Sequence, residues 1–172
     1  MNFKSNALKI AKMAMLVAIS IVLVLIIHFP IFPMVPFLEY DPADIPILIG
    51  AFAFGPVAGA ILTVVTAVIQ GVTVSAASGI YGIIMHVIAT LALVLPSSII
   101  YKKHKTRKRA LVGLAIGCGA MVVVMFFANL GITPAFMGTT ISQILGLMPF
   151  ILLFNLIKAV VNSAVSFILY KK

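Results

Sequence analysis

The chain has 172 residues, of which 63% are hydrophobic and only 9% are charged, and its formal net charge is +9. A soluble domain needs more charge than this to cover its surface, so the composition excludes a soluble globular protein and indicates one integral membrane domain over 1–172. The basic residues form short clusters between apolar runs, a pattern typical of membrane orientation signals rather than of nucleic-acid binding.

The apolar runs predict six membrane-spanning helices, because about 20 apolar residues cross a bilayer as a helix. The predicted spans are residues 8–28, 43–54, 56–71, 81–101, 110–130 and 144–170. The second and third spans are short, and the Phe54-Gly55-Pro56 turn joins them. We expect Pro96 and Pro149 to kink or end their helices.

Three basic clusters predict the orientation of the chain. They are Lys4, Lys9 and Lys12, the lysines and arginines within 101–109, and Lys171 with Lys172. With six spans all three clusters lie on one side, which the positive-inside rule makes cytoplasmic. We therefore predict an all-α membrane protein, a compact bundle of six transmembrane helices with cytoplasmic N- and C-termini. The basic loop 101–109 is then cytoplasmic, and the loops 29–42, 72–80 and 131–143 face outward.

The segment 29–46 holds all three acidic residues of the chain and five of its nine prolines. We predict that it is an extracytoplasmic lid, in which the prolines hold Phe37 and Tyr40 stiffly over a pocket. Asp44 is expected to cap the second helix. Asp41, beside Tyr40, is expected to contact a ligand.

The last span carries a polar stripe, since Asn155, Lys158, Asn162 and Ser166 are spaced at i, i+3, i+7 and i+11. A charge inside the bilayer is costly, so Lys158 must face the bundle interior or a wet cavity. The stripe favours a lined pocket. In the alternative interpretation, the asparagines hold helices together and Lys158 pairs with a buried carbonyl or a loop carboxylate.

Other polar residues point to the same outer half of the bundle. His86 and Thr90 are four residues apart on one helix face, and Asn129 lies at the outer end of its span. His86 is either a ligand contact or a helix-to-helix hydrogen bonder. No metal site is expected, because His86 has no second histidine or carboxylate on its face. The sequence shows no phosphate-binding loop or catalytic motif, so we predict neither enzyme activity nor a cofactor.

The first span carries small residues at three- and four-residue intervals: Ala7, Ala11, Ala14 and Ala18. Small residues at this spacing let helices approach closely. If this alanine stripe faces lipid, it offers a docking surface for another membrane protein. Gly113 and Gly117 have the same kind of spacing and predict ordinary packing within the chain.

The segment FPMVPFLEYDPADIPILIGAFAFGPVAG resembles the start of the substrate-binding S components of energy-coupling factor (ECF) vitamin transporters, most closely their riboflavin-specific members. The resemblance covers most of the chain, through MHVIAT, YKKHKTRKRA, the segment around Asn129, ITPAFMG and FNLIK. It implies six helices around an outward-facing vitamin pocket that the first loop closes. It also implies a membrane coupling subunit docked on the alanine stripe, which Ala14 and Ala18 match, and two cytoplasmic ATPase subunits. His86 stands where riboflavin-specific members usually have Asn.

Together these observations predict a subunit without its own ATPase that captures riboflavin, as transported ligand and not as cofactor, in a bacterial cell membrane. The predicted ligand-binding residues are Phe37, Leu38, Tyr40, Asp41, His86, Thr90, Asn129, Asn155, Lys158 and Asn162. Another vitamin or a nucleobase-like molecule would use the same polar groups and stays an alternative ligand. An autonomous secondary transporter is an alternative of another class, although the sequence lacks the internal repeats typical of that class.

Overall fold

The computed structural model describes residues 3–170, with side chains from Asn6 onward. The α-helices in this range are α1 (Phe3–Ile26), α2 (Asp44–Phe54), α3 (Pro56–Val72), α4 (Gly79–Lys103), α5 (Arg107–Met137) and α6 (Ile141–Tyr170). The connections contain an antiparallel hairpin of β1 (Phe29–Pro30) with β2 (Glu39–Tyr40), and the short 3-10 helix η1 (Ala76–Ser78). The prediction that Lys4, Lys171 and Lys172 lie on the cytoplasmic side concerns side chains outside the described residues.

Four of the described helices are long and apolar enough to cross a membrane: α1, α4, α5 and α6. This confirms the prediction of an all-helical membrane protein. α2 has 11 residues and α3 has 17. At 1.5 Å per residue α2 is only about 16 Å long, roughly half of the ~30 Å hydrocarbon layer. The count of six complete spans therefore stays a prediction.

The connection between α5 and α6 is shorter than the sequence predicted. α5 continues through Pro134 to Met137, so only residues 138–140 separate it from α6, where a loop over 131–143 was expected. Pro134 removes a single hydrogen bond in the last turn, which a helix tolerates near its end. Gly138 stops α5 in the left-handed conformation, with φ of 62°, which glycine adopts without a steric penalty.

The other predicted breaks are also helical. Pro96 and Pro149 lie inside α4 and α6, so neither proline ends its helix. The basic segment 101–109 is divided between the end of α4 and the start of α5, and the side chain of Thr106 caps α5. Most of the expected basic loop is therefore helix termini.

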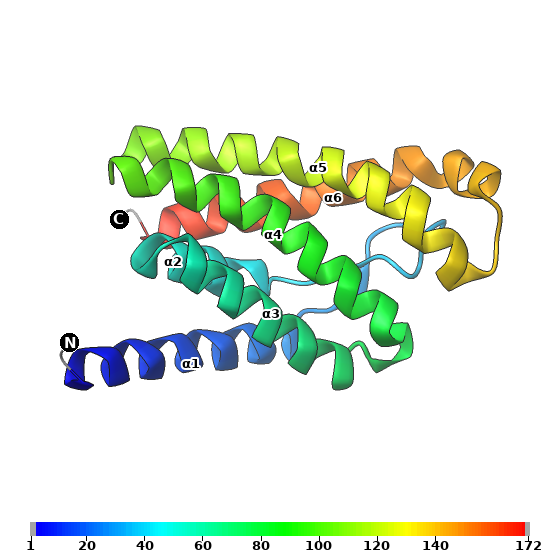
Figure 1. Ribbon diagram of the computed structural model, residues 1–172. Coiled ribbons are helices and arrows are strands. Elements are labelled where there is room, and N and C mark those ends of the chain that lie inside the picture. The colour runs from blue at the N-terminus through cyan, green and yellow to red at the C-terminus, as the bar shows by residue number, and fades with distance from the viewer. Residues whose placement is uncertain (1–2, 171–172) are drawn as a thin grey trace.

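The two ends of the bundle differ in chemistry (Figure 1). Both chain ends and the basic α4–α5 connection lie at one end. The first loop (residues 27–43), η1 and the α5–α6 connection lie at the other. The segments that the sequence predicted to face outward are thus grouped together, and the first loop among them holds Glu39 and Asp41, two of the three acidic residues.

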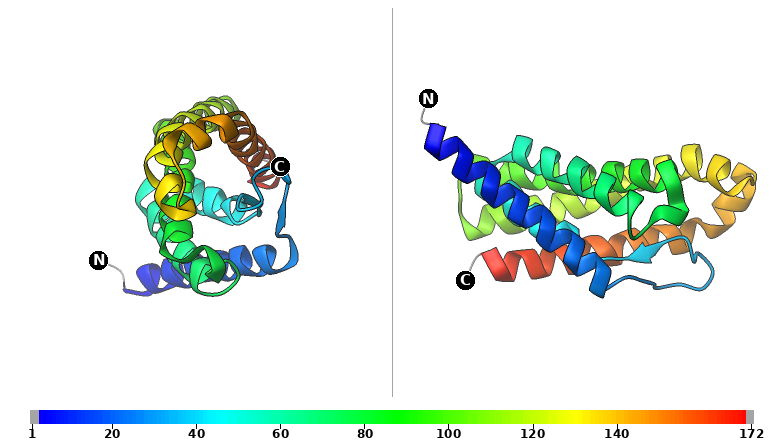
Figure 2. Two further views of the ribbon diagram at one scale, coloured as in Figure 1. Left: turned by 90° about the vertical axis from the view of Figure 1, so that its right-hand side faces the viewer. Right: turned by 90° about the horizontal axis from the view of Figure 1, so that it is seen from below.

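Helix packing follows the distribution of small residues. A Cβ at Gly113 or Gly117 of α5 would meet the backbone of α4 at Ser97 or Leu93, which confirms the predicted close packing there. α1, by contrast, crosses the bundle obliquely (Figure 2), and its main packing partners are α2 and α3. Much of α1 is left exposed.

Two apolar clusters hold the bundle together. The larger one buries α2 between its neighbours and includes Leu48 and Leu93, both fully buried. The smaller one joins the first loop to α6 through Val35 and Ile144, which are also fully buried. Burying a side chain such as Val35 contributes about 1.5–3 kcal/mol, so this contact fixes the centre of the loop on the bundle.

Candidate functional site

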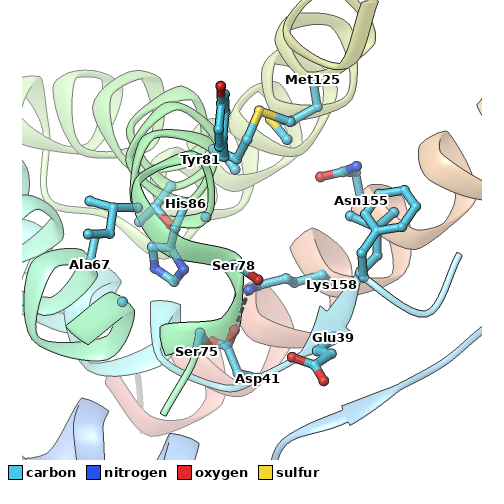
Figure 3. A pocket seen from close by; sticks show the side chains of 18 of the residues that line it. Glu39, Asp41, Ala67, Ser75, Ser78, Tyr81, His86, Met125, Asn155 and Lys158 are labelled. Carbon is cyan, nitrogen blue, oxygen red and sulfur yellow. Dashed lines mark hydrogen bonds and ion pairs between the residues drawn. The ribbon is translucent and has the colours of Figure 1, made fainter. Parts of the chain in front are cut away.

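A cavity lies between the first loop and helices α3 to α6 (Figure 3). Eight of the ten predicted ligand-binding residues line it: Phe37, Leu38, Asp41, His86, Thr90, Asn129, Asn155 and Lys158. Tyr40 and Asn162 are not among its lining residues. The structure thus brings most of the predicted residues into one place, and their contact with a ligand stays a prediction.

A buried ion pair forms part of the cavity wall. Nζ of Lys158 lies 2.8 Å from Oδ2 of Asp41, and the two side chains are 8% and 4% exposed. Gln70 donates its side-chain N–H to the same Oδ2 at 3.3 Å, and the backbone N–H of Ala43 donates to Oδ1 at 3.0 Å. The partner that the sequence left open for Lys158 is therefore a loop carboxylate, and Lys158 also lines the cavity.

The surroundings of Asp41 keep it ionised. Burial alone would raise the pKa of this carboxyl, but the ammonium of Lys158 and the hydrogen bonds outweigh burial and lower the pKa to about 2. Its hydrogen bonds already use three of about four acceptor positions. Asp41 therefore acts mainly as an anchor that joins the loop to α6 and orients Lys158.

The prediction that Asp44 caps α2 is wrong. Ala43 occupies the N-cap position, and no side chain caps this helix. Asp44 is fully buried, and its carboxylate accepts hydrogen bonds from Oγ1 of Thr90 at 2.7 Å and from Nδ2 of Asn162 at 3.0 Å. The carboxylate of Asp44 therefore bonds to residues of α4 and α6, whereas the local capping rule had assigned it to the start of α2.

Asn162 organises contacts between elements. Its amide donates to the backbone oxygen of Asp41 at 3.2 Å and accepts from the hydroxyl of Tyr40 at 2.9 Å. Ser166, one turn further, donates to the backbone oxygens of Asn162 at 2.6 Å and Ile45 at 3.4 Å. This half of the polar stripe holds elements together, as the alternative interpretation had it, whereas the half with Lys158 lines the cavity.

The two other asparagines among the predicted ligand-binding residues, Asn129 and Asn155, line the cavity. Asn155 and Asn129 each donate one N–H to a backbone oxygen of their own helix, at Ile151 and Met125, both at 2.8 Å. Thr133 donates to the side-chain oxygen of Asn129 at 2.8 Å. The side-chain oxygen of Asn155 accepts no hydrogen bond from another described residue, so it is available to a molecule in the cavity.

Aromatic rings and methionines supply the apolar part of the lining. The ring of Phe136 lies 6.4 Å from that of Phe37 and 5.7 Å from that of Tyr81, measured between centroids. Met121 and Met125 line the same cavity. Ring faces and polarisable sulfurs suit a flat, conjugated molecule.

Two fully buried side-chain atoms of the wall have no hydrogen-bond partner among the described residues. They are Oε1 of Gln70 and Nε2 of His86, and both are buried. Gln70 is only 5% exposed. The sequence analysis did not select Gln70, although a long polar side chain near the C-terminal end of an otherwise apolar helix was a signal that could have found it.

The first loop forms one side of the cavity. Nε2 of His28 lies 2.7 Å from Oε2 of Glu39, and both residues line the cavity. The rings of Phe29 and Tyr40 lie 5.6 Å apart across the β1–β2 hairpin. These contacts and the hydrogen bonds of Asp41 tie the loop to the bundle at several points.

A second candidate site is the alanine stripe of α1. Ala7, Ala11, Ala14 and Ala18 are all exposed, so none of them is buried within the chain. The stripe is a smooth surface on a helix that lies at the outside of the bundle.

Comparison with known proteins identifies the family. The ECF transporter, substrate-specific component family matches residues 8–170. The chain is 30% identical over 178 residues to the riboflavin transporter FmnP of Bacillus subtilis (strain 168), which covers 95% of this chain and 90% of that protein. It is 29% identical over 183 residues to the riboflavin transporter RibU of Staphylococcus aureus (strain TCH60), with coverages of 100% and 93%.

The fold agrees with these relatives. The structure matches that of the S component of a bacterial ECF transporter with a TM-score of 0.83 at 30% identity, over 96% of this chain and 95% of that one. The resemblance stated from the sequence is thereby confirmed. The chain belongs to the family of substrate-specific components of ECF transporters, and it is a multi-pass protein of a bacterial cell membrane that serves transport.

Proposed function

We propose that this chain captures riboflavin at the outer face of the membrane for an ATP-driven import complex. The observation that carries the proposal is the cavity, in which a buried lysine and open amide groups lie beside aromatic rings and methionines. Riboflavin has a flat ring system that stacks on such rings, and its ring amide and ribityl hydroxyls need hydrogen-bond partners. The similarity to riboflavin transporters supports this ligand.

The roles of the site residues follow from their positions. Phe37, Leu38, His86, Asn129, Asn155 and Lys158 contact the ligand. Thr90 and Asp41 line the same cavity and, through their hydrogen bonds to Asp44 and Lys158, hold its wall in place. Tyr40 and Asn162 act from outside the lining as positioning residues. The segment 29–46 is the extracytoplasmic lid.

The orientation proposed for the chain has six spans and cytoplasmic termini. The grouping of both chain ends with the basic α4–α5 connection supports it, because cationic residues favour the cytoplasmic side. In this orientation the cavity and its lid face outward. The short helices α2 and α3 then cross the membrane as a pair within the bundle.

The partners proposed for the chain are a membrane coupling subunit and two cytoplasmic ATPase subunits. The exposed alanine stripe of α1, with Ala14 and Ala18, is the docking surface for the coupling subunit. The loaded bundle reorients in the bilayer when that subunit engages α1, which carries the ligand inward. Crosslinking that found the alanine stripe buried inside the monomer would contradict this docking.

Purification in detergent followed by visible absorbance tests the ligand. A tightly bound flavin travels with the protein and colours it yellow. A colourless protein that also fails to quench the fluorescence of added riboflavin would overturn the ligand assignment. Another vitamin or a nucleobase-like molecule would then take its place, and the membership of the family would stand.

A further inference from the structure

The wall between α3 and α4 carries two buried polar atoms that no described residue satisfies, Oε1 of Gln70 and Nε2 of His86. A buried polar atom without a hydrogen-bond partner is energetically unfavourable. Both residues line the cavity, so a group that enters the cavity can satisfy them. The wall is therefore built for a polar part of the ligand.

The orientation of the Gln70 amide is set by its neighbour. Its nitrogen donates to Oδ2 of Asp41 at 3.3 Å. If the amide were flipped, its oxygen would face an ionised carboxylate, which is repulsive. The free atom of Gln70 is therefore the oxygen, which can only accept a hydrogen bond.

Lys158 lies next to this acceptor. Its Nζ donates to the same Oδ2 of Asp41 at 2.8 Å, so Asp41 holds Gln70 and Lys158 side by side. An ammonium group has three N–H donors, and the ion pair uses one of them. The wall thus presents a free acceptor beside free donors.

We infer that Gln70 is a specificity-determining residue whose Oε1 accepts a hydrogen bond from the N–H of an imide edge on the ligand, while Lys158 donates to the adjacent carbonyl. An imide carries a donor N–H directly beside an acceptor C=O, which complements an acceptor beside a donor. The inference rests on the proposed function, because the ring system of riboflavin carries such an edge at N3. It deepens that proposal by naming the imide edge as the part of the ligand that is recognised and Gln70 as the residue that recognises it.

The test compares riboflavin with 3-methylriboflavin, in which a methyl group replaces the N3 hydrogen. Both are titrated against the wild type, Gln70→Ala and the similarly sized Gln70→Leu, with thermal unfolding and gel filtration to confirm folding. The wild type is expected to prefer riboflavin by about tenfold or more, which corresponds to the loss of one hydrogen bond of about 1.4 kcal/mol. In Gln70→Ala this preference is expected to fall below about threefold, because the alanine neither bonds to N3 nor crowds its methyl group.

Asn155→Ala is the matched control, since Asn155 lines the same cavity from α6. It is expected to weaken both ligands and to keep the wild-type preference. Equal binding of the two ligands by the wild type would overturn the inference. It would also be overturned if a folded Gln70 variant that binds both ligands kept the wild-type preference for riboflavin. If the wild type binds riboflavin, these results leave the proposed function intact. If the wild type binds no riboflavin, the proposed function fails and the inference fails with it.

Discussion

Lys158 and Asp41 lie 117 positions apart in the chain, and yet Nζ of the one contacts Oδ2 of the other at 2.8 Å in the wall of the cavity. The pair connects α6 to the first loop, and Gln70 of α3 joins it at the same carboxylate oxygen. Three segments that form the cavity are thus held by one buried carboxylate.

Replacing Lys158 by Met is expected to lower both stability and affinity. The change leaves Asp41 buried without its ionic partner, which typically costs about 3–5 kcal/mol. Adding Asp41→Asn removes the unpaired charge, so the double variant is expected to regain stability but not flavin affinity. Thermal unfolding and flavin titration in detergent measure the two effects. A Lys158→Met protein as stable as the wild type would show that the ion pair does not hold the loop.

Asn155 and Asn162 are expected to differ in what they support, although both lie on one face of α6. Asn155→Ala should weaken riboflavin binding by more than about 1 kcal/mol and change stability little, because its only described bond is within its own helix. Asn162→Ala should destabilise the fold by about 1–3 kcal/mol, because it leaves Oδ2 of Asp44 and the hydroxyl of Tyr40 without the hydrogen bonds that Asn162 provides. The same unfolding and binding assays compare the two. Equal losses of stability would contradict this division of roles.

Bulky substitutions on the alanine stripe are expected to block transport without blocking capture. Ala14→Trp and Ala18→Trp change an exposed face that lies away from the cavity lining, so the isolated chain should bind flavin as the wild type does. Uptake by cells that contain the coupling module should fall strongly. Ala115→Trp, at an exposed alanine of α5, is the matched control and should transport normally. Normal uptake by both α1 variants would place the docking surface elsewhere.

The pH dependence of stability is expected to reveal Asp41. Its pKa of about 2 is below the ordinary value of 3.8, so ionised Asp41 stabilises the fold above the ordinary value, and this contribution is lost as pH falls toward 2. The difference in melting temperature between the wild type and Asp41→Asn should therefore stay constant above about pH 5 and shrink below about pH 4. A difference that already shrinks between neutral pH and about pH 5 would show that Lys158 does not depress this pKa.

The long helices and most of the cavity residues could be predicted because they follow from local patterns. Apolar length identified α1, α4, α5 and α6, and the cost of a charge in lipid placed Lys158 in the interior. What the patterns could not give was the partner of each polar group. Asp44 satisfies the local rule for an N-cap, and only the fold reveals that Thr90 and Asn162 take its oxygens instead.

Spacing along one helix likewise could not divide the polar stripe of α6. Lys158 and Asn162 are one turn apart, but the first loop covers Asn162 through Tyr40 and leaves Lys158 at the cavity. A long polar side chain on an apolar helix could have marked Gln70, but its hydrogen bond to Asp41, 29 positions earlier, could not be predicted from spacing. Both α5 and α6 are longer than predicted, since residues 131–137 and 141–143 of the expected loop are helical, and Pro149 lies within α6 without ending it.

Equilibrium titration of riboflavin with the purified chain tests the central claim most directly, with flavin fluorescence as the readout and Lys158→Met as the comparison. The account predicts saturable quenching by the wild type at one flavin per chain, and an affinity lower by at least about tenfold in the variant, which corresponds to about 1.4 kcal/mol. The absence of saturable quenching by folded wild-type protein, or an affinity that Lys158→Met leaves unchanged, would contradict it.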